Sequence, residues 1–90
     1  MSTEPAPPFK ESKDVKELER IYNDTTLSMF TRYRALFSLR DLGTEEAVRI
    51  IAQGLYNDAN SALFKHEVAF VMGQLGEKAR CSLQALIDVR

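Results

Sequence analysis

The chain has 90 residues and a formal net charge of −1, from 12 basic and 13 acidic side chains. It therefore lacks the basic field that a nucleic-acid backbone requires. Its single cysteine, Cys81, excludes an internal disulfide and fits a reducing compartment. No apolar run approaches the roughly 18 residues of a membrane span, and the first residues do not resemble a secretory signal. These features predict a small cytoplasmic protein that binds neither nucleic acid nor membrane.

All three prolines lie in the first eleven residues. Proline has no backbone N–H and restricts the residue before it, so no helix is expected there. The sequence predicts a flexible leader over residues 1–11, followed by a helical segment over residues 12–90.

The first helix is predicted from Lys13 to Tyr22, with Ser12 as its N-cap. Its apolar residues fall on one stripe at helical spacing. They are Val15, Leu18, Ile21 and Tyr22. Turn-forming residues 23–26 then separate it from the next helix.

The second helix is predicted from Ser28 to Leu42, ending at Gly43 in the left-handed conformation that glycine adopts easily. Thr44 has the chemistry of an N-cap for a third helix. Glu45 and Glu46 would then sit in the positive first turn.

A fourth helix is predicted from Ser61 to Leu75, with Gly76 as its stop. Apolar residues occupy nearly all its sides, so we expect burial on more than one side. A fifth helix is expected from about Glu77 to the last residue.

Two segments of the chain align at a spacing of 33 residues: Arg32–Gly43 and Lys65–Gly76. Phe37 corresponds to Phe70, and both segments end in Leu-Gly. A fixed period in this range is typical of stacked repeats. The pattern predicts an all-α fold, an α-solenoid of about two and a half HEAT-like helical hairpins. Their predicted bounds are 12–43, 44–76 and a partial 77–90.

The two segments differ chemically at one place, where Tyr33-Arg34 is replaced by His66-Glu67. Imidazole and carboxylate are suitable donors for iron, manganese or zinc. However, adjacent helical residues project about 100° apart, and two ligands do not complete a site. From spacing alone, a lone histidine beside a glutamate is more often structural.

The segment Arg32–Arg40, together with Ser61–Leu75, resembles the N-terminal part of deoxyhypusine hydroxylase. That family consists of HEAT-repeat di-iron monooxygenases that complete hypusine formation on translation initiation factor 5A. The resemblance implies that His66 and Glu67 are the first of four His-Glu pairs that bind two irons as Fe2+. It also implies O2 as co-substrate and the deoxyhypusine-containing translation initiation factor 5A as protein partner. No catalytic residue beyond this metal pair is assigned.

Three of the four pairs are absent from these 90 residues, so we expect a truncated form without activity on its own. Three alternatives remain open at this stage. The first is a non-catalytic HEAT-repeat interaction module. The second is a phycobilin-type lyase subunit, for which no motif is present. The third is a short product that acts by pairing with other chains.

Overall fold

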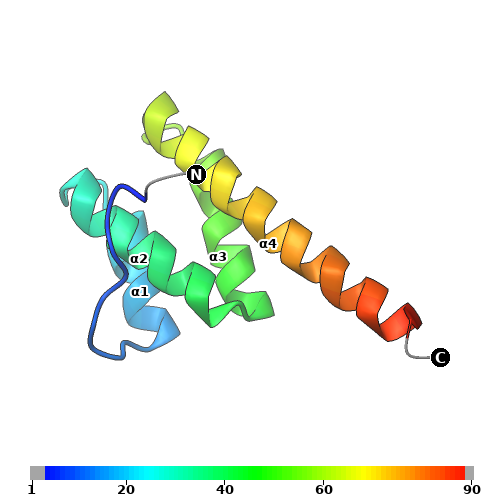
Figure 1. Ribbon diagram of the computed structural model, residues 1–90. Coiled ribbons are helices and arrows are strands. Elements are labelled where there is room, and N and C mark those ends of the chain that lie inside the picture. Colours follow the sequence, from blue (N-terminus) through cyan, green and yellow to red (C-terminus); the bar gives the residue numbers. More distant parts are fainter. Residues whose placement is uncertain (1–3, 89–90) are drawn as a thin grey trace.

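In the computed structural model, the backbone is described for residues 4–88 and the side chains for residues 4–78. This range contains helices and no strand. The helices are α1 (Val15–Asn23), α2 (Met29–Leu42), α3 (Glu45–Tyr56) and α4 (Ala62–Asp88) (Figure 1). The predicted all-α fold is therefore confirmed. The side chain of Cys81 lies outside the described residues.

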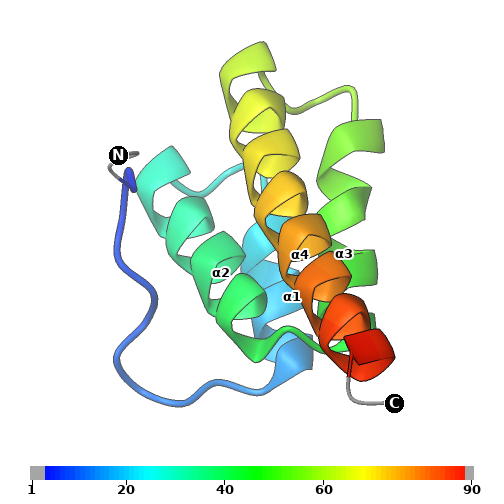
Figure 2. The same cartoon turned by 45° about the vertical axis from the view of Figure 1, so that its right-hand side comes forward.

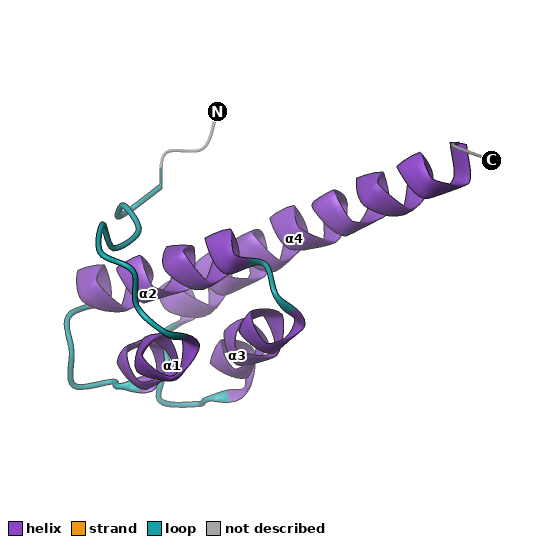
Figure 3. Ribbon diagram, turned by 90° about the horizontal axis from the view of Figure 1, so that it is seen from below, coloured by secondary structure: helices purple, strands orange, loops and turns teal. Residues whose placement is uncertain are grey.

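The helices form two layers. Seen from below, α1 and α3 lie side by side in one layer, and α2 and α4 form the other (Figure 3). Each hairpin thus places its first helix in one layer and its second helix in the other. This is the arrangement of a HEAT-like stack.

Three of the predicted helix starts are confirmed by their caps. The hydroxyls of Ser28, Thr44 and Ser61 each accept a hydrogen bond from the backbone N–H three residues later, at 3.2, 3.1 and 3.1 Å. The first helix differs, because Asp14 rather than Ser12 provides the cap. Its carboxylate accepts from the N–H of Glu17 at 2.8 Å, so α1 begins at Val15.

The predicted stop at Gly76, with a separate fifth helix after it, is wrong. Gly43 ends α2 with a φ of 62°, whereas α4 continues through Gly76 to Asp88. Glycine permits a left-handed stop but does not impose one. Gly43 is followed by Thr44, which caps the next helix, whereas Gly76 is followed by Glu77, which favours helix continuation. The repeat boundaries drawn at residues 43 and 76 stay a prediction.

The segment expected to be a flexible leader packs along α2 over residues 4–11. Ala6 is 3% exposed, and the Phe9 N–H donates to the Ser38 hydroxyl at 3.0 Å. The Arg34 guanidinium donates to the Pro7 carbonyl at 3.2 Å and lies 4.5 Å from the centroid of the Phe9 ring. The extended proline-rich backbone leaves its carbonyl oxygens available, and Arg34 donates to two of them, those of Pro7 and Pro8.

The two hairpins meet at Tyr22 of α1 and Gly54 of α3. The fully buried Tyr22 hydroxyl donates to the Ile51 carbonyl at 2.7 Å. A Cβ placed on Gly54 would lie 2.2 Å from that hydroxyl oxygen. Glycine is required here because α1 and α3 approach closely, not because of backbone conformation.

A buried arginine joins the same elements. The Arg32 Nε donates to the Tyr22 carbonyl at 3.0 Å, and its Nη2 donates to Asn60 Oδ1 at 2.6 Å. Asn60 in turn donates to the Gly54 carbonyl at 3.0 Å. The guanidinium lies 4.0 Å from the centroid of the Phe64 ring. These contacts connect the end of α1, the end of α3 and the first turn of α4 through one side chain.

Gly54→Ala is expected to lower the free energy of unfolding by about 2 kcal/mol, because overpacking displaces Tyr22 from its hydrogen bond. Urea denaturation followed by circular dichroism measures the change. Gly73→Ala is the matched control, since a Cβ there meets nothing within 4 Å. The control should be neutral or slightly stabilising, as alanine favours helix over glycine. Equal effects of the two variants would contradict the close approach.

Arg32→Lys is expected to destabilise the fold by about 2 kcal/mol, because lysine keeps the charge but lacks the planar fork that serves two acceptors. Thermal unfolding compared with Arg49→Lys, at an exposed position on α3, measures this. A neutral Arg32→Lys variant would show that charge alone suffices.

Candidate metal half-site

His66 and Glu67 lie in the first turns of α4, whose start is fixed by the Ser61 cap. Their neighbours Phe64 and Val68 are both fully buried in the core. These two anchors set the rotation of the helix. They leave the His66 side chain exposed and that of Glu67 half-buried.

Glu67 lies on the side of α4 that faces α2, because it follows Phe64 by three residues and Phe64 contacts Tyr33 of α2. The ring of Tyr33 stacks on Phe64, with centroids 5.6 Å apart and planes inclined by 4°. Burial raises the pKa of the Tyr33 hydroxyl, the charge of Glu67 raises it further, and Arg32 opposes the shift. A carboxylate has this effect because it disfavours a second negative charge nearby. Glu67 is therefore positioned within electrostatic reach of the first hairpin.

His66 projects in another direction. Within the described residues, no hydrogen bond or ion pair engages its imidazole. Both ring nitrogens are therefore available to an external ligand. An exposed, uncommitted imidazole beside a half-buried carboxylate is a suitable pair of donors for a transition metal.

The pair does not form a complete site within this part of the chain. Among residues with described side chains, no group of three or more histidine, cysteine, aspartate or glutamate residues is placed to hold a metal. The donor chemistry fits a metal, while the number of donors fits only half of a coordination shell. Metal ligation by His66 and Glu67 stays a prediction.

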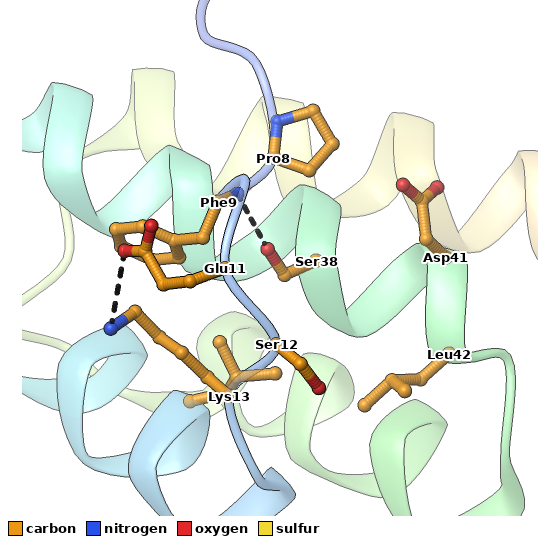
Figure 4. A pocket seen from close by; sticks show the side chains of 9 residues that line it. Pro8, Phe9, Glu11, Ser12, Lys13, Ser38, Asp41 and Leu42 are labelled. Atoms are coloured by element: carbon orange, nitrogen blue, oxygen red, sulfur yellow. Dashed lines mark hydrogen bonds and ion pairs between the residues drawn. The ribbon is translucent and has the colours of Figure 1, made fainter.

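A separate cavity of about 190 Å³ lies between residues 8–13, α1 and α2 (Figure 4). Apolar and polar side chains share its walls, and the Glu11–Lys13 ion pair of 3.6 Å crosses one edge. Neither His66 nor Glu67 lines it. It could not be foreseen from the sequence, because it exists only where residues 8–13 pack onto the helices.

Tyr33 is the neighbour of the pair that sequence reasoning did not single out as part of the site. The 33-residue repeat carried the signal, because Tyr33 occupies the position equivalent to His66. Its burial against α4 shows which way this repeat position faces.

Among the described residues, no helix is long and apolar enough to cross a membrane.

A family model described as PBS lyase HEAT-like repeat matches residues 31–57, which is less than half of the chain. This match spans α2 and α3 and agrees with the helical hairpins of the structure. Fold and match together define an all-α protein of HEAT-like repeats.

The curated relatives that match this chain are deoxyhypusine hydroxylases. The deoxyhypusine hydroxylase of Drosophila melanogaster is 55% identical over 94% of this chain and 27% of its own length. Those of Saccharomyces cerevisiae and Danio rerio are 47% and 48% identical, over 98% and 97% of this chain. No solved structure matches. The chain is thus homologous to one segment of the deoxyhypusine hydroxylases and spans about a quarter of the length of the relatives it matches.

Glu67→Gln is expected to lower the pKa of Tyr33, because it removes the negative charge that disfavours the phenolate. The Cζ chemical shift of 13C-labelled tyrosine, followed from pH 7 upward by NMR, measures it. Glu46→Gln, in the exposed first turn of α3, is the control and should leave that titration unchanged. An unchanged Tyr33 titration in Glu67→Gln would place Glu67 away from α2.

Proposed function

We propose that this chain is a segment of a deoxyhypusine monooxygenase. The complete enzyme hydroxylates the deoxyhypusine side chain of translation initiation factor 5A, in the cytoplasm, with O2 and iron. The observation that carries this proposal is the identity of 55% to a named deoxyhypusine hydroxylase over 94% of the chain.

In this proposal His66 and Glu67 are iron ligands. The support is local: the imidazole has no partner within the described residues, and the carboxylate beside it is anchored by the buried Phe64 and Val68. Two donors are too few for a metal site, so the remaining ligands come from residues outside this chain. The fraction of the relatives that the chain spans, about a quarter, leaves ample sequence to provide them.

Iron, when bound, supplies the O2 activation that amino-acid side chains do not provide. The residues of this chain would hold the metal and orient its ligands. The Ser61 cap and the Phe64 anchor fix the helix turn from which both donors project. The deoxyhypusine side chain is a cationic polyamine, and the charge of Glu67 would also attract it. The 90-residue chain alone is expected to be inactive, because one pair cannot complete the site.

The test is a chimera in which this chain replaces the matching quarter of the Drosophila melanogaster enzyme. Incubated with Fe2+, O2 and deoxyhypusine-bearing factor, the chimera should add one oxygen atom to the substrate, as measured by mass spectrometry. His66→Ala should abolish turnover and lower the iron content, because second-shell changes alone already cost roughly 10- to 100-fold. Tyr56→Phe, at an exposed position on α3, is the control and should retain activity.

Glu67→Gln in the chimera separates two roles of this residue. Loss of iron identifies Glu67 as a ligand, whereas retained iron with a raised KM for the substrate indicates an electrostatic role. A His66→Ala chimera with full iron and full activity would contradict metal ligation. That outcome would favour a non-catalytic interaction module as the role of this segment.

A further inference from the structure

Arg40, near the end of α2, joins three elements through one guanidinium. Its Nη1 donates to Glu4 of the leader and, at 3.4 Å, to Gln74 of α4. Its Nε and Nη2 donate to the neighbouring Asp41 at 3.3 and 3.2 Å. Its Cζ lies 4.9 Å from the centroid of the fully buried Phe37 ring. The side chain is only 18% exposed, so these partners hold it in one orientation.

The leader reaches Arg40 from outside the helical layers. It starts over the layer of α2 and α4, on the side opposite α1 and α3 (Figure 3), and runs along α2 before it reaches α1 (Figure 2). Its later part is held by Arg34 and Ser38. Ala6, between the two held parts, is 3% exposed, so the leader is packed rather than merely tethered. The first contact of this packed leader is with the residue that also binds α4.

Gln74 shares a face of α4 with Glu67. The two residues are seven apart, which is close to two full turns of helix. On α2, Arg40 follows Tyr33 by the same seven residues, and Tyr33 stacks on Phe64 of α4. Side-chain contacts therefore join α2 and α4 at two levels. An aromatic stack lies near the level of Glu67, and a polar contact lies two turns further along.

Two contacts separated along the helix axes constrain the tilt of one helix against the other, which a single contact leaves free. The separation here is about 11 Å, from two turns of 5.4 Å. Because Nη1 donates to Glu4 and Gln74 at once, Glu4 holds the guanidinium where it reaches α4. Without Glu4, the carboxylate of Asp41 is the remaining charged partner and draws the guanidinium toward α2.

We propose that Arg40 is a positioning residue for Glu67 and that the leader acts through it. The Glu4–Arg40–Gln74 contact holds α4 at one tilt against α2, and so sets the direction in which the Glu67 carboxylate is presented to a metal. Arg40 acts only through the pose of α4, since Glu67 lies two turns away. The ligand role of Glu67 rests on the proposed function, whereas the link from leader to α4 does not.

The first test is amide hydrogen exchange of the full 90-residue chain, followed by NMR. Glu4→Gln should lower the protection factors of amides 70–78 by about three- to tenfold, as loss of one hydrogen bond of ordinary strength implies. Gln74→Ala should do the same, and the double variant should lose no more than either single one, because both remove one link. Glu11→Gln is the matched control. It neutralises a leader acid that pairs with Lys13 instead, at 3.6 Å, and should leave α4 unchanged.

The second test uses the Drosophila melanogaster chimera loaded with Co2+, whose visible absorption bands report the arrangement of its ligands. Arg40→Lys keeps the charge but lacks the planar fork that serves three partners. It should shift the absorption maximum while the amount of bound Co2+ stays the same. Glu4→Gln, which leaves every helix residue in place, should shift it in the same direction. Arg49→Lys, at an exposed position on α3, is the control and should leave the spectrum unchanged.

The outcomes separate this link from the proposed ligands. Unchanged protection in Glu4→Gln, or additive losses in the double variant, overturn the link from leader to α4. A lower unfolding temperature in Arg40→Lys with an unchanged Co2+ spectrum, where His66→Ala does alter the spectrum, overturns positioning and leaves the ligands standing. A chimera whose Co2+ binding is altered by neither His66→Ala nor Glu67→Gln overturns the proposed ligands, and with them the positioning of Glu67 for a metal. Lost protection of α4 in Glu4→Gln would still support the link.

Discussion

The buried guanidinium of Arg32 is the constraint on which the arrangement of the helices depends. A buried charge is costly unless its donors are satisfied. Arg32 achieves this only when the Tyr22 carbonyl, the Asn60 side chain and the Phe64 ring stand where they do. Any shift of the second hairpin relative to the first would leave those donors unpaired. The network therefore specifies one register between the hairpins, in addition to the burial of apolar surface.

The same network positions the candidate ligands. Asn60 and Phe64 flank the first turn of α4, so the contacts that satisfy Arg32 also fix the rotation of the helix that bears His66 and Glu67. The two candidate ligands differ in direction on this helix. Glu67 lies half-buried on the side that packs against the first hairpin, whereas His66 is exposed on the adjacent side.

Local signals predicted most of the fold correctly. The caps at Thr44 and Ser61 act over three residues and could be identified without tertiary context. The stop predicted at Gly76 failed because glycine only permits a stop, and the capping residue that completes it at Gly43 has no equivalent there. The packing of the leader also escaped prediction, since it depends on Arg34, a residue distant in sequence. The His66–Glu67 pair was identifiable from the repeat, and its ligation of a metal stays a prediction.

The length of α4 has a mechanical consequence. It comprises 27 residues, or about 40 Å of helix at 1.5 Å per residue, and its buried described side chains, Phe64, Val68 and Val71, lie in its first half (Figure 1). Because an α-helix is stiff, a tilt of this packed half is carried along the whole helix axis. A tilt of about 10° about the first turn of α4 would move its far end by about 7 Å over this helix length. Small rearrangements where α4 begins would thus be amplified into large displacements at its end.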